Sequence, residues 1–298
     1  CWASKAASMK LTTAQLGAAW MILGVLCMAS MDVMAKTLGH RVPVAQIVWL
    51  RFVSQAILIG AFLIISGQSL LSSNHFRLHT LRGFATTTSS YLFFLAVIYL
   101  PLADATALMQ VAPVMVALGA VLVLRERIGK RRVFGIIAAF IGTMILIRPG
   151  TSVMTTMSLV PLIGAVFFAI YALATRFVRD DGPWKALFYQ GFFGACFASL
   201  IVPFFWQPIA HNDIPILITL ILLGIIGHLF IISAFATAQA SDIAPFGYAG
   251  LLFAISFGII IFGEIPHILT LLGAIVIVSA GLYVWYRERL TEADPEND

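Results

Sequence analysis

The sequence predicts an all-α integral membrane protein in which ten transmembrane helices form two inverted five-helix repeats. The first observation behind this is composition: 61% of the 298 residues are hydrophobic, 10% are charged, and the mean hydropathy is +1.00. Such a composition is typical of a polytopic membrane protein and not of a soluble domain. The second is an internal duplication, because the stretch from Asp104 to Glu126 has a copy from Asp242 to Glu264, offset by 138 residues. Duplications of this kind build many membrane folds.

Ten apolar stretches are long enough to cross roughly 30 Å of hydrocarbon. They lie near residues 15–35, 43–66, 80–99, 103–124, 131–148, 157–177, 184–205, 214–235, 241–262 and 266–286. Several links between them are very short, so we expect consecutive helices to be antiparallel neighbours. The predicted organisation is an N-terminal leader at 1–14, a first repeat at 15–149, a second repeat at 157–286 and a tail at 287–298.

Basic residues predict the orientation, since positively charged loops stay in the cytoplasm. Of the 18 Lys and Arg residues, Arg51 lies within a span and three lie on the side away from the N-terminus (Lys36, Arg41 and Arg148), which leaves fourteen on the side of the N-terminus. An even number of spans brings both termini to that side. We therefore expect a multi-pass protein of the cell inner membrane with cytoplasmic termini. The pI near 9.3 then follows from orientation, and no nucleic-acid partner is expected.

The duplicated region carries a resemblance. Its two copies read LMQVAPVMVALGAVLVLRERIGKRRVFGIIAAFIGTMILI and APFGYAGLLFAISFGIIIFGEIPHILTLLGAIVIVSAGLYV. Over residues 15–286 the chain resembles the EamA-type ten-helix members of the drug/metabolite transporter superfamily, and looks nearest to the S-adenosylmethionine-uptake and riboflavin-uptake branches. The resemblance implies a carrier with a central cavity between its halves, lined by the first to fourth and sixth to ninth helices.

Ionisable residues at membrane depth indicate where a substrate binds, because they are expensive in lipid. Asp32 and Lys36 share one face of the first helix at i and i+4, and Arg51 lies about 12 Å below the start of the second helix. The trio has a net charge of +1, which favours a small organic anion or a zwitterion. The alternative is a structural bridge between Asp32 and Arg51 with Lys36 reaching the interface, in which case a neutral or zwitterionic substrate has equal standing.

Neutral polar groups within the spans complete the predicted substrate-binding set: Tyr91, Gln110, Tyr171, Gln190, His228 and Tyr248. They would hold an apolar or heterocyclic part of the substrate. Two readings stay open for His228, a satisfied core histidine and a proton-coupling group.

Proline and small residues suggest how the helices move and pack. Pro113 and Pro245 lie inside the duplicated helices, where each frees a backbone carbonyl and is either a hinge for alternating access or a simple kink. Glu126 and Glu264, at the ends of these helices, are interpreted as structural partners of the helix that follows. Stripes of small residues around Gly142 and Gly273 allow close helix approach, either within a monomer or in a homodimer.

Other functional classes fit less well. Asp32 is the only carboxylate predicted inside the membrane, and the three cysteines lack metal-ligand spacing, so neither an enzyme, a metal site nor a cofactor is expected. A passive channel would show a continuous polar stripe. The function predicted is secondary-active transport of a small metabolite across the lipid bilayer by alternating access; export of cationic or amphiphilic compounds is the alternative.

Overall fold

The computed structural model describes residues 13–69, 73, 75–124, 130–147, 156–178, 181–238 and 243–293, and within these ranges the regular structure is helical. The first half contains α1 (Thr13–Leu38), α2 (Val44–Ile65), α3 (Phe76–Tyr99), α4 (Leu102–Met109), α5 (Ala112–Leu124) and α6 (Lys130–Ile147). The second half contains α7 (Val160–Arg176), α8 (Gly182–Ile201), α9 (Ile214–Thr237), α11 (Ala249–Phe262) and α12 (Ile268–Ala293). Four short 3-10 helices accompany them: η1 (Thr156–Leu159), η3 (Val202–Phe205), η4 (His211–Asp213) and η5 (Ala244–Tyr248).

Each of the ten predicted spans corresponds to a helix or to a pair of helical segments. Among the described residues, six helices are long and apolar enough to cross a membrane, namely α1, α2, α3, α7, α8 and α9. Shorter apolar helices lie at Leu102–Val116, Phe246–Phe262 and Ile268–Tyr283. The chain is therefore a multi-pass helical membrane protein, as the hydropathy predicts.

The fourth and ninth spans are interrupted, whereas the sequence analysis expected continuous helices with internal prolines. α4 ends at Met109 and α5 begins at Ala112, so Gln110 lies in the break and Pro113 in the first turn of α5. The ninth span starts as η5, with Pro245 in its first turn. Proline has no N–H, and the first turn of a helix is where that donor would have no intrahelical partner. Both prolines thus begin helical segments.

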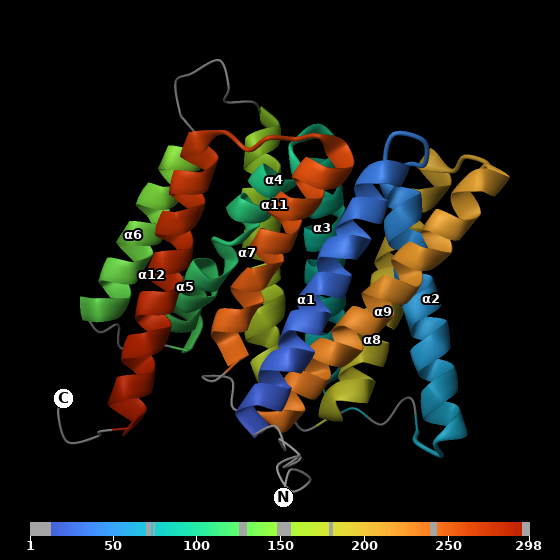
Figure 1. Ribbon diagram of the computed structural model, residues 1–298. Coiled ribbons are helices and arrows are strands. Elements are labelled where there is room, and N and C mark those ends of the chain that lie inside the picture. The colour runs from blue at the N-terminus through green and yellow to red at the C-terminus, as the bar shows by residue number, and fades with distance from the viewer. Residues whose placement is uncertain are drawn as a thin grey trace, which may run out of the picture.

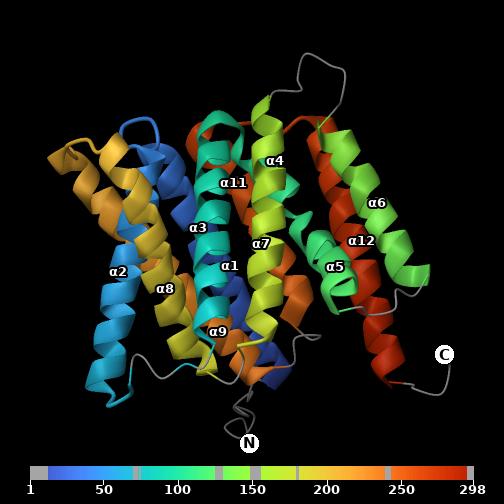
Figure 2. The same ribbon diagram turned by 180° about the vertical axis from the view of Figure 1, so that it is seen from behind.

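The helices cross the molecule alternately in opposite directions (Figures 1 and 2). The start of α1 and the end of α12 lie at the same end of the bundle, which we call the proximal end, and the turn between α1 and α2 lies at the distal end (Figure 1). α6 and α12 form one flank of the bundle and α2 lies at the other (Figure 1). An even number of crossings brings both ends of the helical core to the same side.

The most extensive helix contacts join the two halves of the chain. α1 packs on α9, α3 on α7, α2 on α8, and α6 on α12, while α4 meets α11 near the middle. The halves are consequently interleaved, and any site at the centre of the bundle is built from both.

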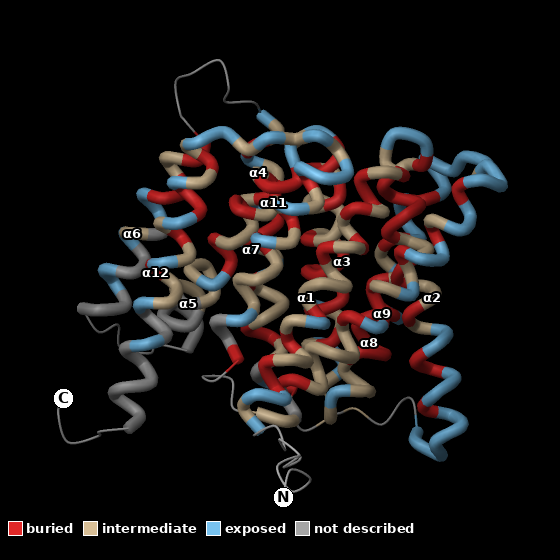
Figure 3. The backbone as a smooth tube through the Cα atoms, viewed as in Figure 1, coloured by how far each residue is buried: buried red, intermediate tan, exposed pale blue. Residues whose placement is uncertain are grey.

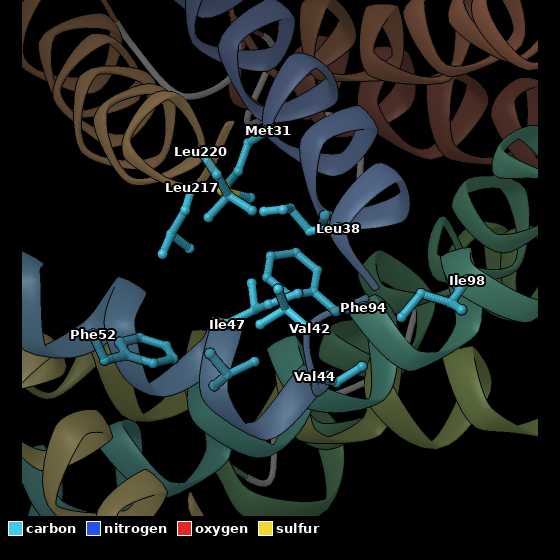
Figure 4. Packing of buried hydrophobic residues seen from close by; sticks show 12 residues of the cluster. Met31, Leu38, Val42, Val44, Ile47, Phe52, Phe94, Ile98, Leu217 and Leu220 are labelled. Carbon is cyan, nitrogen blue, oxygen red and sulfur yellow. The ribbon is translucent and has the colours of Figure 1, made fainter. Parts of the chain in front are cut away.

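An apolar cluster fills the space between α1, α2, α3 and α9 toward the distal end (Figure 4). Its largest fully buried members include Leu38, Ile47, Phe52, Phe94 and Leu220. Lipid chains are as apolar as these side chains, so the cluster stabilises the bundle through close van der Waals contact more than through removal from water. The cluster packs between the helices that carry several of the polar groups described below.

Glycines face each other where helices approach most closely. A Cβ on Gly24 of α1 would lie 3.2 Å from the carbonyl oxygen of Gly227 of α9, and a Cβ on Gly227 would lie 3.1 Å from the Gly24 carbonyl oxygen. Gly142 of α6 and Gly273 of α12 face each other in the same way, at 3.0 and 2.8 Å. These pairs allow backbone-to-backbone packing. The small residues at Gly142 and Gly273 therefore pack within one chain.

Burial separates the helix interfaces from the outer surface (Figure 3). Buried residues gather along the middle of the bundle, and exposed residues follow the proximal part of α2 (Figure 3). That exposed surface is apolar, since Ile57, Ile64 and Ile65 are 64%, 62% and 86% exposed. Large apolar side chains in such positions fit contact with lipid chains.

Candidate substrate-binding site

Arg51 is the central cation of the site. It comes from α2, is only 5% exposed, and its Nη1 donates to the Ser90 hydroxyl of α3 at 2.9 Å. The guanidinium lies 5.1 and 5.8 Å from the ring centroids of Phe52 and Phe94. Among the described residues its buried Nε has no hydrogen-bond partner. Arginine can only donate, so this guanidinium has donor capacity left for an oxygen-bearing ligand.

Asp32 of α1 supplies the carboxyl group of the site. It is half-buried and interacts electrostatically with Arg51. The direct ion pairs of the described residues, however, join other partners. The alternative predicted from the sequence, a bridge in which Asp32 contacts Arg51 directly, is therefore not formed. Asp32 and Arg51 therefore interact across the site without a direct ion pair.

The second half of the chain contributes hydrogen-bonding groups. The Tyr171 hydroxyl of α7 donates to Gln190 Oε1 of α8 at 3.2 Å, and Gln190 Nε2 lies 3.5 Å from the Thr86 hydroxyl of α3. Gln190 is 2% exposed. Tyr171 also interacts electrostatically with Arg51, which places this chain of polar groups beside the guanidinium.

α9 closes the site with a histidine and a glycine. His228 Nδ1 lies 2.7 Å from the Gly224 carbonyl oxygen, which can only accept, so Nδ1 carries the hydrogen. His228 interacts electrostatically with Arg51. A Cβ on Gly224 would lie 3.5 Å from Arg51 Nε and 3.0 Å from Met31 Sδ. The glycine therefore lets the α9 backbone approach the guanidinium.

Five of the nine predicted binding residues converge here: Asp32, Arg51, Tyr171, Gln190 and His228. Ser90, Thr86 and Gly224 join them, and we call these eight residues the Arg51 cluster. They come from α1, α2 and α3 of the first half and α7, α8 and α9 of the second. The cluster is thus a site between the two halves.

Three other predicted residues lie elsewhere. Tyr248 turns its hydroxyl toward α12, where a Cβ on Gly281 would collide with it. Tyr91 lines a half-open cavity of about 180 Å³ at the distal end, together with Pro43 of the turn before α2. Gln110 ends α4, and no hydrogen bond within the described residues connects its side chain to the Arg51 cluster. Sequence spacing alone could not show which way these side chains turn.

Lys36 belongs to a second assembly, which we call the distal latch. Its Nζ forms an ion pair with Glu264 Oε1 at 2.5 Å and donates to the Leu100 carbonyl at 2.7 Å. Glu264 Oε2 accepts the backbone N–H of Leu102 at 2.8 Å, at the start of α4. Glu264 therefore caps α4 and not, as the sequence analysis expected, the last helix. Its structural interpretation fits the contacts, while Glu126 lies outside the described residues.

The distal latch changes the charge balance predicted for the site. Lys36 is 6% exposed and paired, so it neither reaches the interface nor adds a charge to the Arg51 cluster. The expected surplus of +1 is wrong, because Glu264 neutralises Lys36. Asp32 and Arg51 remain as the acidic and the basic side chain of the cluster.

Three residues of the cluster were missed by the sequence analysis. Thr86 and Ser90 are the two ends of the run TTTSS, five consecutive hydroxyl residues inside an apolar span, which is a signal that could have identified them. Gly224 has no such signal, because glycines are common in membrane helices.

The fold and this site define a polytopic membrane protein with a buried, charge-balanced polar centre shared by two halves, an arrangement suited to moving a solute. A family model agrees: the chain belongs to the EamA-like transporter family, whose model matches residues 15–148 and 155–286. Its members are transporters, so the chain is a transport protein and not an enzyme.

Relatives of known function share about a quarter of their residues with this chain over nearly the whole length. The S-adenosylmethionine uptake transporter of Rickettsia prowazekii is 26% identical over 92% of this chain and 93% of its own. The pseudopaline exporter of Pseudomonas aeruginosa is 26% identical over 87% and 92%. The riboflavin transporter of Vibrio cholerae is 28% identical over 90% and 92%. The first and third confirm the two branches that the sequence resembles.

The fold also matches a solved crystal structure. That structure covers 93% of this chain and 98% of its own, with a TM-score of 0.65 and 16% sequence identity. At this identity the likeness concerns the fold alone.

Proposed function

We propose that the protein is a secondary-active transporter of a small zwitterionic metabolite of amino-acid type. The observation that carries this is the pair formed by the buried Arg51 and the half-buried Asp32, which interact without direct contact while Arg51 Nε has no partner among the described residues. A substrate carboxylate would take the guanidinium donors, which suit planar oxyanions. A substrate cation would lie toward Asp32. Each buried charge would then be neutralised, as charges in lipid require.

Alternating access between inverted halves is the proposed mechanism. It is supported by the helix pairing, because exchanging the halves maps the α1–α9 pair onto the α7–α3 pair and leaves the α2–α8 and α6–α12 pairs unchanged. That is the pairing expected of an inverted two-fold relation. Pro113 and Pro245, each at the start of a segment in an interrupted span, are proposed as hinges where those spans bend.

The proposed orientation places the proximal end in the cytoplasm, because fourteen of the 18 Lys and Arg residues are predicted on the side of the N-terminus. Single-cysteine labelling of intact cells tests it. A membrane-impermeant reagent should reach cysteines at His211 and His267, two exposed residues just before α9 and α12, helices that begin at the distal end (Figure 1), but not a cysteine at Lys130. Labelling at Lys130 would overturn the topology.

The relatives suggest which compounds separate the hypotheses. S-adenosylmethionine carries an α-carboxylate, an α-ammonium and a sulfonium, whereas riboflavin carries neither a carboxylate nor an ammonium group. Binding of labelled S-adenosylmethionine but not of riboflavin to the purified protein would support a zwitterion site. Saturable counterflow in proteoliposomes would distinguish a carrier from a channel, since a pore cannot produce it.

Substitutions then test the pair itself. Arg51→Gln should weaken binding roughly 10–100-fold, because a hydrogen bond to a charged group contributes about 1.5–3 kcal/mol. Asp32→Asn should weaken it by a similar factor if the substrate cation lies there. Arg41→Gln is the matched control, since Arg41 is 49% exposed at the distal end. Full activity in Arg51→Gln would exclude the proposed site.

A further inference from the structure

A second buried polar network lies toward the proximal end, outside the Arg51 cluster. His79 and Arg82 of α3 are 0% and 2% exposed. Asp181, at the start of α8, accepts a hydrogen bond from the Ser73 hydroxyl at 2.6 Å and lies 2.8 Å from His79 Nε2. Arg82 Nε donates to the Thr175 hydroxyl of α7 at 2.9 Å. The network therefore ties α3 of the first half to α7 and α8 of the second.

The donors and acceptors of this network specify the protonation state of His79. Arg82 Nη1 lies 2.9 Å from His79 Nδ1, and a guanidinium can only donate. Nδ1 is therefore the acceptor and carries no hydrogen. Nε2 carries the hydrogen and donates to Asp181 Oδ2. If Nδ1 took up a proton, its N–H would face the Arg82 N–H, and the imidazolium would face the guanidinium, so that two donors and two cations would meet. Protonation of Nδ1 and the hydrogen bond from Arg82 therefore exclude one another.

We propose that His79 is a proton-binding site of the transporter and that the bound proton displaces Arg82 from His79 Nδ1. The bond from Nε2 to Asp181 survives protonation, because a cationic imidazole still donates there and gains an ion pair. Arg82 is the group that has to move. The proton thus acts on the guanidinium and leaves the contact with α8 in place.

Arg82 connects this proton site to the substrate site. Its guanidinium carbon lies 5.4 Å from the centroid of the Tyr171 ring, and Tyr171 also interacts electrostatically with Arg51. Tyr171 is therefore shared by both arginines. Release of Arg82 from His79 changes the cationic charge beside the Arg51 cluster, so proton binding and substrate binding are linked, and such a linkage is reciprocal. This step rests on the proposed function and adds the coupling ion to it.

The groups around His79 are consistent with a single titrating site. Arg82 faces Nδ1 from the same helix, Asp181 faces Nε2 from the start of α8, and His75 interacts electrostatically from the turn before α3. Tyr189 of α8 stacks on the imidazole with a centroid separation of 4.4 Å. Burial opposes the ionised form of Asp181, yet the hydrogen bonds from Ser73 and His79 hold its pKa below the usual value. Asp181 therefore stays a carboxylate while a histidine titrates.

Nitrogen NMR of the purified full chain with labelled histidines tests the site without any substrate. At about pH 8, above the usual histidine range, His79 should be the tautomer with hydrogen on Nε2; a His79→Gln variant assigns its signals among the six histidines. Arg82→Met should raise the midpoint of the His79 titration by about one pH unit or more, since the competing charged donor is lost. Arg77→Met, at an exposed position of the same helix, should leave the midpoint unchanged. Hydrogen on Nδ1 of the neutral imidazole at about pH 8, or the same midpoint in Arg82→Met as in the wild type, would overturn the proposal.

Uptake into proteoliposomes tests the coupling. With labelled S-adenosylmethionine as the probe, the wild type should respond to an imposed pH gradient and His79→Gln should not, because Gln can bridge Arg82 and Asp181 but cannot take the proton. An equal response in both proteins contradicts the coupling. The NMR result does not depend on transport. If the proposed function is wrong and the probe is not taken up, the titration of His79 can still be measured. If His79→Gln does not fold, the comparison of the titration midpoints of Arg82→Met and the wild type still tests the proton site.

Discussion

Removal of Glu264 should expose how strongly the distal latch holds the two halves together. In Glu264→Met, the described residues leave the buried Lys36 cation two partners, the Leu100 carbonyl and the Phe262 ring, whose centroid lies 5.2 Å from Nζ. Breaking a buried ion pair from one side costs about 3–5 kcal/mol. The Glu264 side chain is 23% exposed, so we expect the lower part of that range, about 3 kcal/mol. Loss of the acceptor for the Leu102 N–H adds about 1 kcal/mol.

Thermal unfolding of the purified protein in detergent measures this loss. About 4 kcal/mol corresponds to a decrease in Tm of roughly 10 °C for a chain of this size. Glu264→Gln should lose less, because its carbonyl still accepts from Leu102. The double variant Lys36→Met with Glu264→Met should be no less stable than Glu264→Met alone, since no unpaired charge remains. The control is Arg77→Met, at an exposed position of α3, which removes no buried charge and should change the stability by about 0.5 kcal/mol or less. Strictly additive losses in the double variant would refute the latch.

Three further predictions concern packing, movement and pH. Gly273→Val should lower stability by about 1–3 kcal/mol, because a Cβ there would lie 2.8 Å from the Gly142 carbonyl oxygen; an unchanged Tm would contradict this packing. Pro113→Ala and Pro245→Ala should slow turnover in proteoliposomes while Tm is retained, and the hinge role is wrong if both leave turnover unchanged. The pKa of Asp181 is lower in the folded chain than its usual value of about 3.9, so its carboxylate stabilises the fold above that value and the contribution disappears as the pH falls through the folded-state pKa. Asp181→Asn should therefore be less stable than the wild type at neutral pH, and Tm measured against pH should show the difference vanish in acid; a pH-independent difference would show that the charge is not the cause.

The spans could be predicted from the sequence because hydropathy in a bilayer is a local property. Arg51 and Asp32 were found for the same reason, since a charge inside an apolar stretch is visible without knowing its neighbours. The break at Gln110 and the 3-10 start of the ninth span, η5, were not predicted, because proline signals a weakened helix but not whether the chain bends or restarts there.

Partners distant in the chain were the main source of error. Lys36 was grouped with Asp32 and Arg51, because it shares a helix face with Asp32 at i and i+4. Its ion-pair partner is instead Glu264, and nothing local distinguishes that carboxylate from a helix cap. His79 and Arg82 lie near the proximal end of α3, where a polar residue is by default assumed to contact water. Only the packing of α3 on α7 and α8 buries them.

The order of synthesis means that the distal latch can form only late, after Glu264 has been made. Lys36 is made 228 residues before Glu264, from 264 minus 36, and at roughly 5–20 residues per second that interval lasts about 10–45 s. Throughout it, α1 lies in the membrane with a lysine whose anion does not yet exist, and for most of it α9, the main packing partner of α1, has not been made either. The lysine can satisfy its charge only by extending toward the lipid headgroups. We therefore expect α1 to be the last helix to take its final depth, and a chain cut off before α11 to leave it shifted toward the distal surface.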